Sequence, residues 1–312
     1  MPVALSSVDH VYTFLNNVSL PSRPTMITAL SGGITNKLFK ILLEDGTSLS
    51  CRFFGNKTCI VIDRDQEHFL RHHLIQFTLA PRVLFSSNEG DVAEYIEGRS
   101  LEDNEMAAFA PLVIESLCKL HSCPVPSQSA NKSIFDTIRI WISQLESSNT
   151  MVSLDLSRIL VLLKNFEHRI SQLPKLNLCI CHNDLLSGNL ILTPDNQISF
   201  IDFEYCSLNN PAYDLANFFV EHCTFQMNSK LFPKRKRRLE LLSQYQNLMN
   251  HPISLSDFCD LVDNFVFVSL IYWAVWAELM AQCVDVEFDY RLFAQKRINV
   301  LDDWLRGNYL SL

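Results

Sequence analysis

The sequence lacks the features that mark a secreted, membrane-spanning or repetitive protein. Its first residues contain no basic segment followed by an apolar core, so we expect no secretory signal. The longest uncharged apolar stretch, residues 265–277, has thirteen residues. That is fewer than the roughly 20 that cross a bilayer, and it predicts a buried helix. No internal repeat or low-complexity tract is present, and a net charge of −8 gives no broad attraction to nucleic acid or anionic lipid.

The ten cysteines form no pattern that requires a disulfide or a metal. Without a secretory signal they are expected to be reduced thiols in the cytoplasm. The run Cys118-x2-His121-x-Cys123 contains metal ligands, but no second ligand pair follows at the spacing of a zinc finger. Because Leu117 and Leu120 share the same expected helix, buried thiols are the favoured interpretation.

The chain contains enough apolar material for a large packed core. A hydrophobic fraction of 48% and 21 Phe among 312 residues are unlike a disordered protein. This length allows one large domain or two lobes that share a cleft. The patterning predicts an α+β fold in which a small β-rich lobe, residues 1–97, precedes a larger, mainly helical lobe, residues 98–312. In the first lobe we expect helices over 5–20 and 63–77, and strands over 27–30, 38–43, 49–54, 81–85 and 91–96.

Two polar runs in the second lobe, residues 181–189 and 201–205, each lie beside short β-prone segments. The first contains Asp184 and Asn189, and the second contains Asp202. Protein kinases use an Asp-x4-Asn loop and then a metal-binding Asp in the same order. Either run alone would be a weak signal, because Asp and Asn are common in turns. Together they predict phosphoryl transfer from ATP, with Asp184 orienting or deprotonating the acceptor hydroxyl and with Asn189 and Asp202 holding Mg²⁺.

These runs also resemble the signatures of a known family. Residues 182–189, His-Asn-Asp-Leu-Leu-Ser-Gly-Asn, are similar to the phosphotransferase loop of the choline/ethanolamine kinase family. Residues 200–205, then Asn209 and residues 213–217, resemble its second signature. Related antibiotic and methylthioribose kinases keep the catalytic Asp and Asn but not the Asp-Phe-Glu-Tyr continuation. The resemblance covers nearly the whole chain and implies a protein-kinase-like bilobal fold with ATP as co-substrate.

The first lobe contains the expected nucleotide site. Gly32 and Gly33 lie between two expected strands and would let backbone N–H groups approach phosphate oxygens. The run 31–36 is not a Walker A sequence, and alone it indicates only a tight turn. By resemblance it is the family's nucleotide loop, Arg52 meets the α/β-phosphates, and Glu67 pairs with Arg52; an unrelated surface Arg and Glu are the alternative. The residues expected at ATP are Ser31, Gly32, Gly33, Thr35, Asn36, Arg52, Glu67, Glu94 and Ile96.

An aromatic pair and an acid predict where a cationic acceptor binds. Trp273 and Trp276 stand three residues apart, on one face of an expected helix. Such a pair belongs to a hydrophobic core more often than to a cage around an ammonium group. The resemblance favours the cage and places Glu221 beside the ammonium, whereas Phe293 stands where choline kinases commonly carry Tyr. The expected substrate-binding residues are Asp184, Tyr205, Glu221, Trp273, Trp276 and Phe293.

The residues alone do not separate ethanolamine from choline, because a carboxylate suits a primary ammonium and aromatic faces suit a quaternary one. Segments 33–38, 54–58 and 61–67 resemble ethanolamine kinases more closely. The expected reaction is therefore ATP-dependent phosphorylation of ethanolamine to phosphoethanolamine, the first step of the CDP-ethanolamine route to phosphatidylethanolamine. Choline kinase is the alternative within the family. A non-catalytic nucleotide-binding scaffold, or a kinase for an aminoglycoside or methylthioribose, is the alternative outside it. The resemblance also implies a homodimer.

A run of five basic residues, Lys234–Arg238, belongs to neither expected site. Such runs target proteins to the nucleus or contact anionic lipid. Apolar residues at helical spacing follow this run, which favours a solvated first helical turn. Cations at a helix N-terminus oppose the helix dipole, so a further use of this run stays open.

Overall fold

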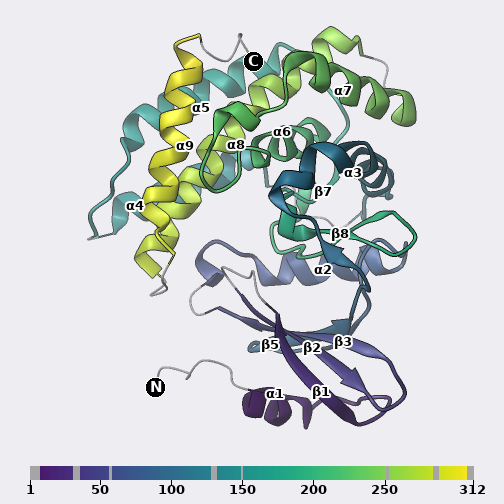
Figure 1. Cartoon of the computed structure of the whole chain (residues 1–312). Helices are drawn as coiled ribbons and strands as arrows, with labels where there is room; N and C mark the ends of the chain where they lie inside the picture. Colours follow the sequence, from purple (N-terminus) through teal and green to yellow (C-terminus); the bar gives the residue numbers. More distant parts are fainter. Residues whose placement is uncertain are drawn as a thin grey trace.

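The computed structural model shows two lobes, a small one built on a β-sheet and a larger one built of helices (Figure 1). The predicted α+β fold is confirmed. The residues that the structure describes are 8–30, 36–55, 58–127, 132–148, 150–250, 253–283 and 288–307.

A five-stranded antiparallel sheet forms the first lobe, in the strand order β1-β2-β3-β5-β4. Its elements are α1 (Val8–Leu15), β1 (Pro24–Leu30), β2 (Asn36–Leu43), β3 (Ser48–Phe54), η1 (Thr58–Ile60), α2 (Arg64–Ile75), β4 (Val83–Ser86) and β5 (Gly90–Glu94). Burial alternates along β2 and β3, so that Phe39 and Ile41 point into a small core that α1 covers. Gly46 closes the β2–β3 hairpin at φ 84°, a conformation that glycine adopts without strain.

The five strands predicted for this lobe are all present, with ends shifted by a few residues. The first helix is shorter than expected, because α1 ends at Leu15 and the next residues form turns with i→i+3 hydrogen bonds. Its predicted first residues, 5–7, lie outside the described part of the chain. The second helix, α2, begins as expected after Asp63, whose side chain accepts a hydrogen bond from the Gln66 N–H.

The second lobe packs its helices around α8, which has 29 residues and is buried over most of its length. Its helices are η2 (Asp103–Glu105), α3 (Met106–His121), α4 (Ile134–Ser147), α5 (Leu156–Ser171), η3 (Ser187–Asn189), α6 (Pro211–Glu221), η4 (Ser229–Leu231), α7 (Arg235–Met249), α8 (Leu255–Cys283) and α9 (Tyr290–Leu305). By length and composition α8 could cross a membrane, but 78% of its most apolar window is buried inside the protein. The stretch 265–277 is thus the predicted buried helix.

Short strands carry the polar runs at the face of this lobe that meets the first lobe. They are β6 (Arg99–Ser100), β7 (Cys179–Cys181), β8 (Leu190–Leu192), β9 (Ile198–Phe200) and β10 (Ser207–Asn209). β6, β8 and β9 form one antiparallel sheet, and β7 pairs with β10. Gly98 precedes β6 with φ 146°, and a Cβ there would lie 2.5 Å from the carbonyl oxygen of Leu192. Only glycine lets the chain cross between the lobes this close to β8.

Candidate active site

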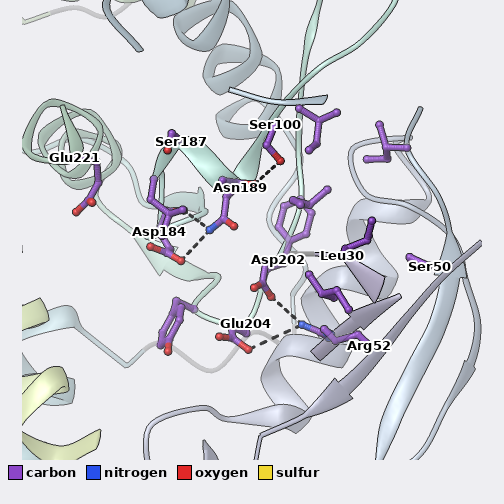
Figure 2. Close-up of a pocket in the computed structure, with 18 of the residues that line it drawn as sticks. Leu30, Ser50, Arg52, Ser100, Asp184, Ser187, Asn189, Asp202, Glu204 and Glu221 are labelled. Atoms are coloured by element: carbon purple, nitrogen blue, oxygen red, sulfur yellow. Dashed lines mark hydrogen bonds and ion pairs between the residues drawn. The ribbon is translucent and has the colours of Figure 1, made fainter. Parts of the chain in front are cut away.

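A cavity of about 530 Å³ lies between the two lobes and is lined by both (Figure 2). It contains eleven of the predicted site residues: Arg52, Glu94, Ile96, Asp184, Asn189, Asp202, Tyr205, Glu221, Trp273, Trp276 and Phe293. Two others, Asn36 and Glu67, are buried behind the lining side chains and do not face the cavity. The predicted nucleotide-loop residues Ser31, Gly32, Gly33 and Thr35 lie outside the described residues.

Buried hydrogen bonds fix the loop that follows β7. The side-chain amide of Asn189 donates to Oδ2 of Asp184 at 2.8 Å, which brings both side chains to the same part of the cavity (Figure 2). At the start of the loop, the backbone N–H groups of His182 and Asn183 donate to the Asp214 carboxylate on α6, at 2.8 and 2.7 Å. Asn183 has a left-handed backbone, φ 68°, a conformation that costs free energy for a residue with a side chain. The buried Asp214 carboxylate on α6 therefore holds the loop in this conformation.

The pKa of Asp184 lies well above its usual range. Burial is the main cause, and the negative charges of Glu221, Asp202 and Glu204 add to it, while the hydrogen bond from Asn189 opposes the shift. A carboxylate with a raised pKa holds a proton more readily, so Asp184 suits the acceptance of a proton from a hydroxyl group.

Asp202 and Glu204 place two further carboxylates in the cavity. Burial raises the pKa of both, that of Glu204 to about 7. No described residue donates a hydrogen bond to the side-chain oxygen of Asn189, whose nitrogen is used by Asp184. Carboxylate and amide oxygens are the ligands that Mg²⁺ prefers. The pKa values of Asp202 and Glu204 are raised even though Arg52 and Arg64 lie nearby, so a further cation would stabilise both carboxylates. These residues therefore fit a divalent cation, which Asn189 and Asp202 would hold with Glu204 beside them.

Arg52 connects the two lobes through carboxylates. On its own lobe it pairs with Glu67 and, at 2.7 Å, with Asp91; across the cavity its Nη1 lies 2.8 Å from Oδ1 of Asp202 (Figure 2). Glu67 also accepts from Arg64, and burial, which alone would raise its pKa, is outweighed by the two arginines, so the pKa is lowered. The predicted Arg52–Glu67 ion pair is present, and the pair to Asp202 was not expected.

The far end of the cavity is aromatic. Tyr205, Trp273 and Trp276 meet edge to face, with ring centroids 5.0 Å apart for the first two and 5.2 Å for the two tryptophans. The indole N–H of Trp276 donates to the Tyr205 hydroxyl at 2.8 Å. Phe293 lies 6.2 Å from Trp276. Rings in this arrangement can present their faces to a cation, so the Trp pair lines a cavity as well as packing in the core.

Glu221 faces the same end of the cavity, but it is not a lone carboxylate. Its Oε1 lies 3.0 Å from Nη2 of Arg297, on α9, and both side chains are buried. The guanidinium of Arg297 stacks over the Phe293 ring at 4.3 Å. The acceptor end therefore holds a neutralised acid, so aromatic faces and the more distant Asp184 and Glu204 supply much of its attraction for a cation.

Sequence reasoning missed several groups that build the site. Asp214 and Glu204 stand inside the recognised signatures, so their presence there was an available signal. Arg297 and Asp91 lie in segments with no such motif. His121, the middle member of the Cys-His-Cys run, forms hydrogen bonds with the Asp214 carboxylate at 3.0 Å and the Tyr245 hydroxyl at 2.7 Å. The thiols of that run are buried, as predicted.

Comparison with known proteins fits this geometry. The sequence profile of choline/ethanolamine kinases matches residues 27–302. The chain belongs to the choline/ethanolamine kinase family. It is 28% identical to the probable ethanolamine kinase A of Dictyostelium discoideum over 88% of this chain and 83% of that one. It is 25% identical to the probable choline kinase 3 of Arabidopsis thaliana, over 90% and 86%.

Solved structures show the same architecture. The ethanolamine kinase of Plasmodium vivax superposes with a TM-score of 0.81 at 22% identity, covering 94% of this chain and 85% of that one. An ADP-bound aminoglycoside phosphotransferase superposes at 0.59 and 16% identity. The protein-kinase-like bilobal fold expected from the sequence is thereby confirmed.

Proposed function

We propose that this protein transfers the γ-phosphoryl group of ATP to the hydroxyl of ethanolamine, giving phosphoethanolamine and ADP. One observation carries the proposal: a single cavity joins a kinase-type set of Asp184, Asn189 and Asp202 to an aromatic end that suits a small cation. The family uses ATP, and the relatives named above include an ethanolamine kinase that matches nearly the full chain.

Each catalytic residue has a task that follows from its place. The acceptor's ammonium group lies against the rings of Trp273 and Trp276, which directs the hydroxyl toward Asp184. Asp184 accepts the hydroxyl proton as the oxygen bonds to the γ-phosphorus and the bond to ADP breaks. Arg52 supplies positive charge at the phosphates. Asn189 and Asp202 would hold Mg²⁺, which would neutralise phosphate charge. Because the transition state of phosphoryl transfer is loose, positioning and charge neutralisation account for most of the rate.

Ethanolamine is proposed over choline on two grounds. Two relatives with ethanolamine kinase in their names are 28% and 26% identical to this chain, against 25% for the choline kinase named above. Segments of the first lobe also resemble ethanolamine kinases more closely. A non-catalytic scaffold is disfavoured because the three polar groups of the catalytic set are all present and meet in one cavity.

The test is Mg²⁺-dependent ADP release with ethanolamine and choline in parallel, with Asp184→Ala and Asp202→Ala as controls. We expect turnover with ethanolamine well above that with choline, and loss of turnover in both variants without loss of folding. Faster turnover with choline would make the protein a choline kinase. ATP binding without turnover of either alcohol would favour the scaffold.

We also propose that the protein acts in the cytoplasm and supplies the CDP-ethanolamine route to phosphatidylethanolamine. All ten cysteines are free thiols, and eight of them are buried, which suits a reducing compartment. A homodimer is proposed on family resemblance, and light scattering on the purified chain tests it.

A further inference from the structure

The turn that leads into α7 carries an isolated concentration of positive charge. Six of the 26 Lys and Arg residues fall within residues 230–238, and no Asp or Glu lies between Glu221 and Glu240. We name residues 230–237 the basic turn. Its side chains at Lys230, Lys234, Arg235 and Lys236 are exposed, and that at Arg237 is half-buried. Helix α7 lies at the end of the larger lobe remote from the N-terminal sheet (Figure 1).

Only one member of the predicted basic run is structural. Arg238, expected to be solvated, is 1% exposed, donates to the Pro233 carbonyl at 2.7 Å and lies 3.6 Å from Asp263. This corrects the prediction for that residue, because α8 packs over it.

Few acidic side chains neutralise the exposed cations of the basic turn. Arg235 reaches Asp263 at 3.7 Å, and Arg237 pairs with Glu240 at 3.1 Å. Across the described part of the chain, Lys230, Lys234 and Lys236 form no ion pair. Asp260, one turn from Asp263 on α8, is the next exposed acid of that helix. The basic turn thus remains net positive on a chain that is net negative.

Folding does not account for this arrangement. Cations in the first turn oppose the dipole of α7, and Lys234 at the N-cap makes no side-chain capping bond. The first N–H groups of α7 and the surrounding ammonium groups instead suit phosphate oxygens. Positive charge that costs helix stability and finds few acids points to an anionic partner.

An exposed apolar side chain among the cations identifies the class of partner. Leu231 is 50% exposed and stands between Lys230 and Lys234. An anionic bilayer presents phosphates and carboxylates directly above acyl chains. One surface can therefore bind both the basic side chains and the apolar Leu231 side chain. A nucleic acid offers phosphates without that apolar layer. The acidic remainder of the chain has little effect on a bilayer contact, since charges more than about 10 Å away are screened.

We infer that the basic turn docks this protein on an anionic phospholipid bilayer, with Lys230, Lys234 and Lys236 facing the headgroups and Leu231 entering the interface. The contact is reversible and salt-sensitive, because it rests on a few charges and one apolar side chain.

The experiment is co-sedimentation of the full chain with vesicles of phosphatidylcholine alone and of phosphatidylcholine with phosphatidylserine. The wild type is expected to bind the anionic vesicles at low salt and to leave them at high salt. Each cation near the surface contributes about fivefold, so the double variant Lys234→Glu/Lys236→Glu should lower vesicle partitioning at least about twentyfold. Leu231→Ser should lower it by less.

A matched control changes the same net charge elsewhere. Lys164→Glu/Lys175→Glu alters two exposed lysines on and beyond α5 and should retain vesicle binding. Equal losses in both double variants, or no binding of the wild type, would overturn the inference. So would tighter binding of a DNA duplex that the Lys234/Lys236 changes abolish. ADP release without vesicles should be unchanged in both double variants, which separates this test from that of the proposed function.

Discussion

We predict that the hydrogen bonds of Asp214 hold the catalytic loop in its active conformation. Its carboxylate is fully buried and accepts from the backbone N–H groups of His182 and Asn183 and from Nε2 of His121, at 2.7 to 3.0 Å. The change Asp214→Asn keeps the shape but replaces one oxygen by an NH₂ group. That nitrogen must then face an N–H donor, whichever way the amide is turned.

The cost follows from those contacts. A hydrogen bond to a charged group contributes about 1.5–3 kcal/mol, and a buried N–H without a partner costs about 1–3 kcal/mol. We expect the free energy of unfolding to fall by about 3–4 kcal/mol. Because the same peptide groups set the position of Asp184, a shift of about 1 Å there should lower kcat about 100-fold. KM for ATP should change little.

Urea unfolding and steady-state ADP release measure the two effects. Asp260→Asn, an exposed Asp on α8, is the matched control and should change stability by no more than about 0.5 kcal/mol. If Asp214→Asn keeps its kcat and loses less than about 1 kcal/mol, the carboxylate does not hold the loop and the reasoning is refuted.

Three further predictions concern the acceptor end and its surroundings. Tyr205→Phe removes the acceptor of the Trp276 N–H. It should raise KM for the amino alcohol about fivefold, since one hydrogen bond contributes about 1 kcal/mol. An unchanged KM would show that this hydrogen bond does not contribute to substrate binding. Arg297→Met leaves Glu221 charged and unpaired, and should cost about 3–5 kcal/mol of stability. Arg297→Lys should recover part of that loss, and equal losses in urea unfolding would contradict the ion-pair argument. Burial lowers the pKa of His222 to about 4, below the unfolded value near 6.5. The unfolded chain therefore binds the extra proton, and wild-type stability should fall by about 3 kcal/mol more than that of His222→Gln between pH 7 and pH 4; parallel curves would exclude this cause.

The sequence predicted those parts of the site that a short motif carries. Asp184, Asn189 and Asp202 are defined by spacing within one loop and one turn, so local pattern located them. The strands of the first lobe were equally accessible, because alternation of apolar residues is a local property.

The contacts that fix those residues were beyond local pattern. Asp214 reaches back 31 residues to Asn183, and Arg297 reaches Glu221 across 76 residues. Only the packing of α6 and α9 decides such pairs. For Arg238 the local pattern was misleading. A run of basic residues predicts solvent-exposed side chains, but the packing of α8 buries this one.

The bond between Arg52 and Asp202 has a consequence for motion. This ion pair joins the two lobes through the same carboxylate that a divalent cation would also use. Asp202 would then share its carboxylate between Arg52 and a bound cation, and the Arg52 guanidinium would also lie within reach of phosphate oxygens. The contact between the lobes would therefore weaken or strengthen with the charge that a bound cation and phosphates bring to this one ion pair.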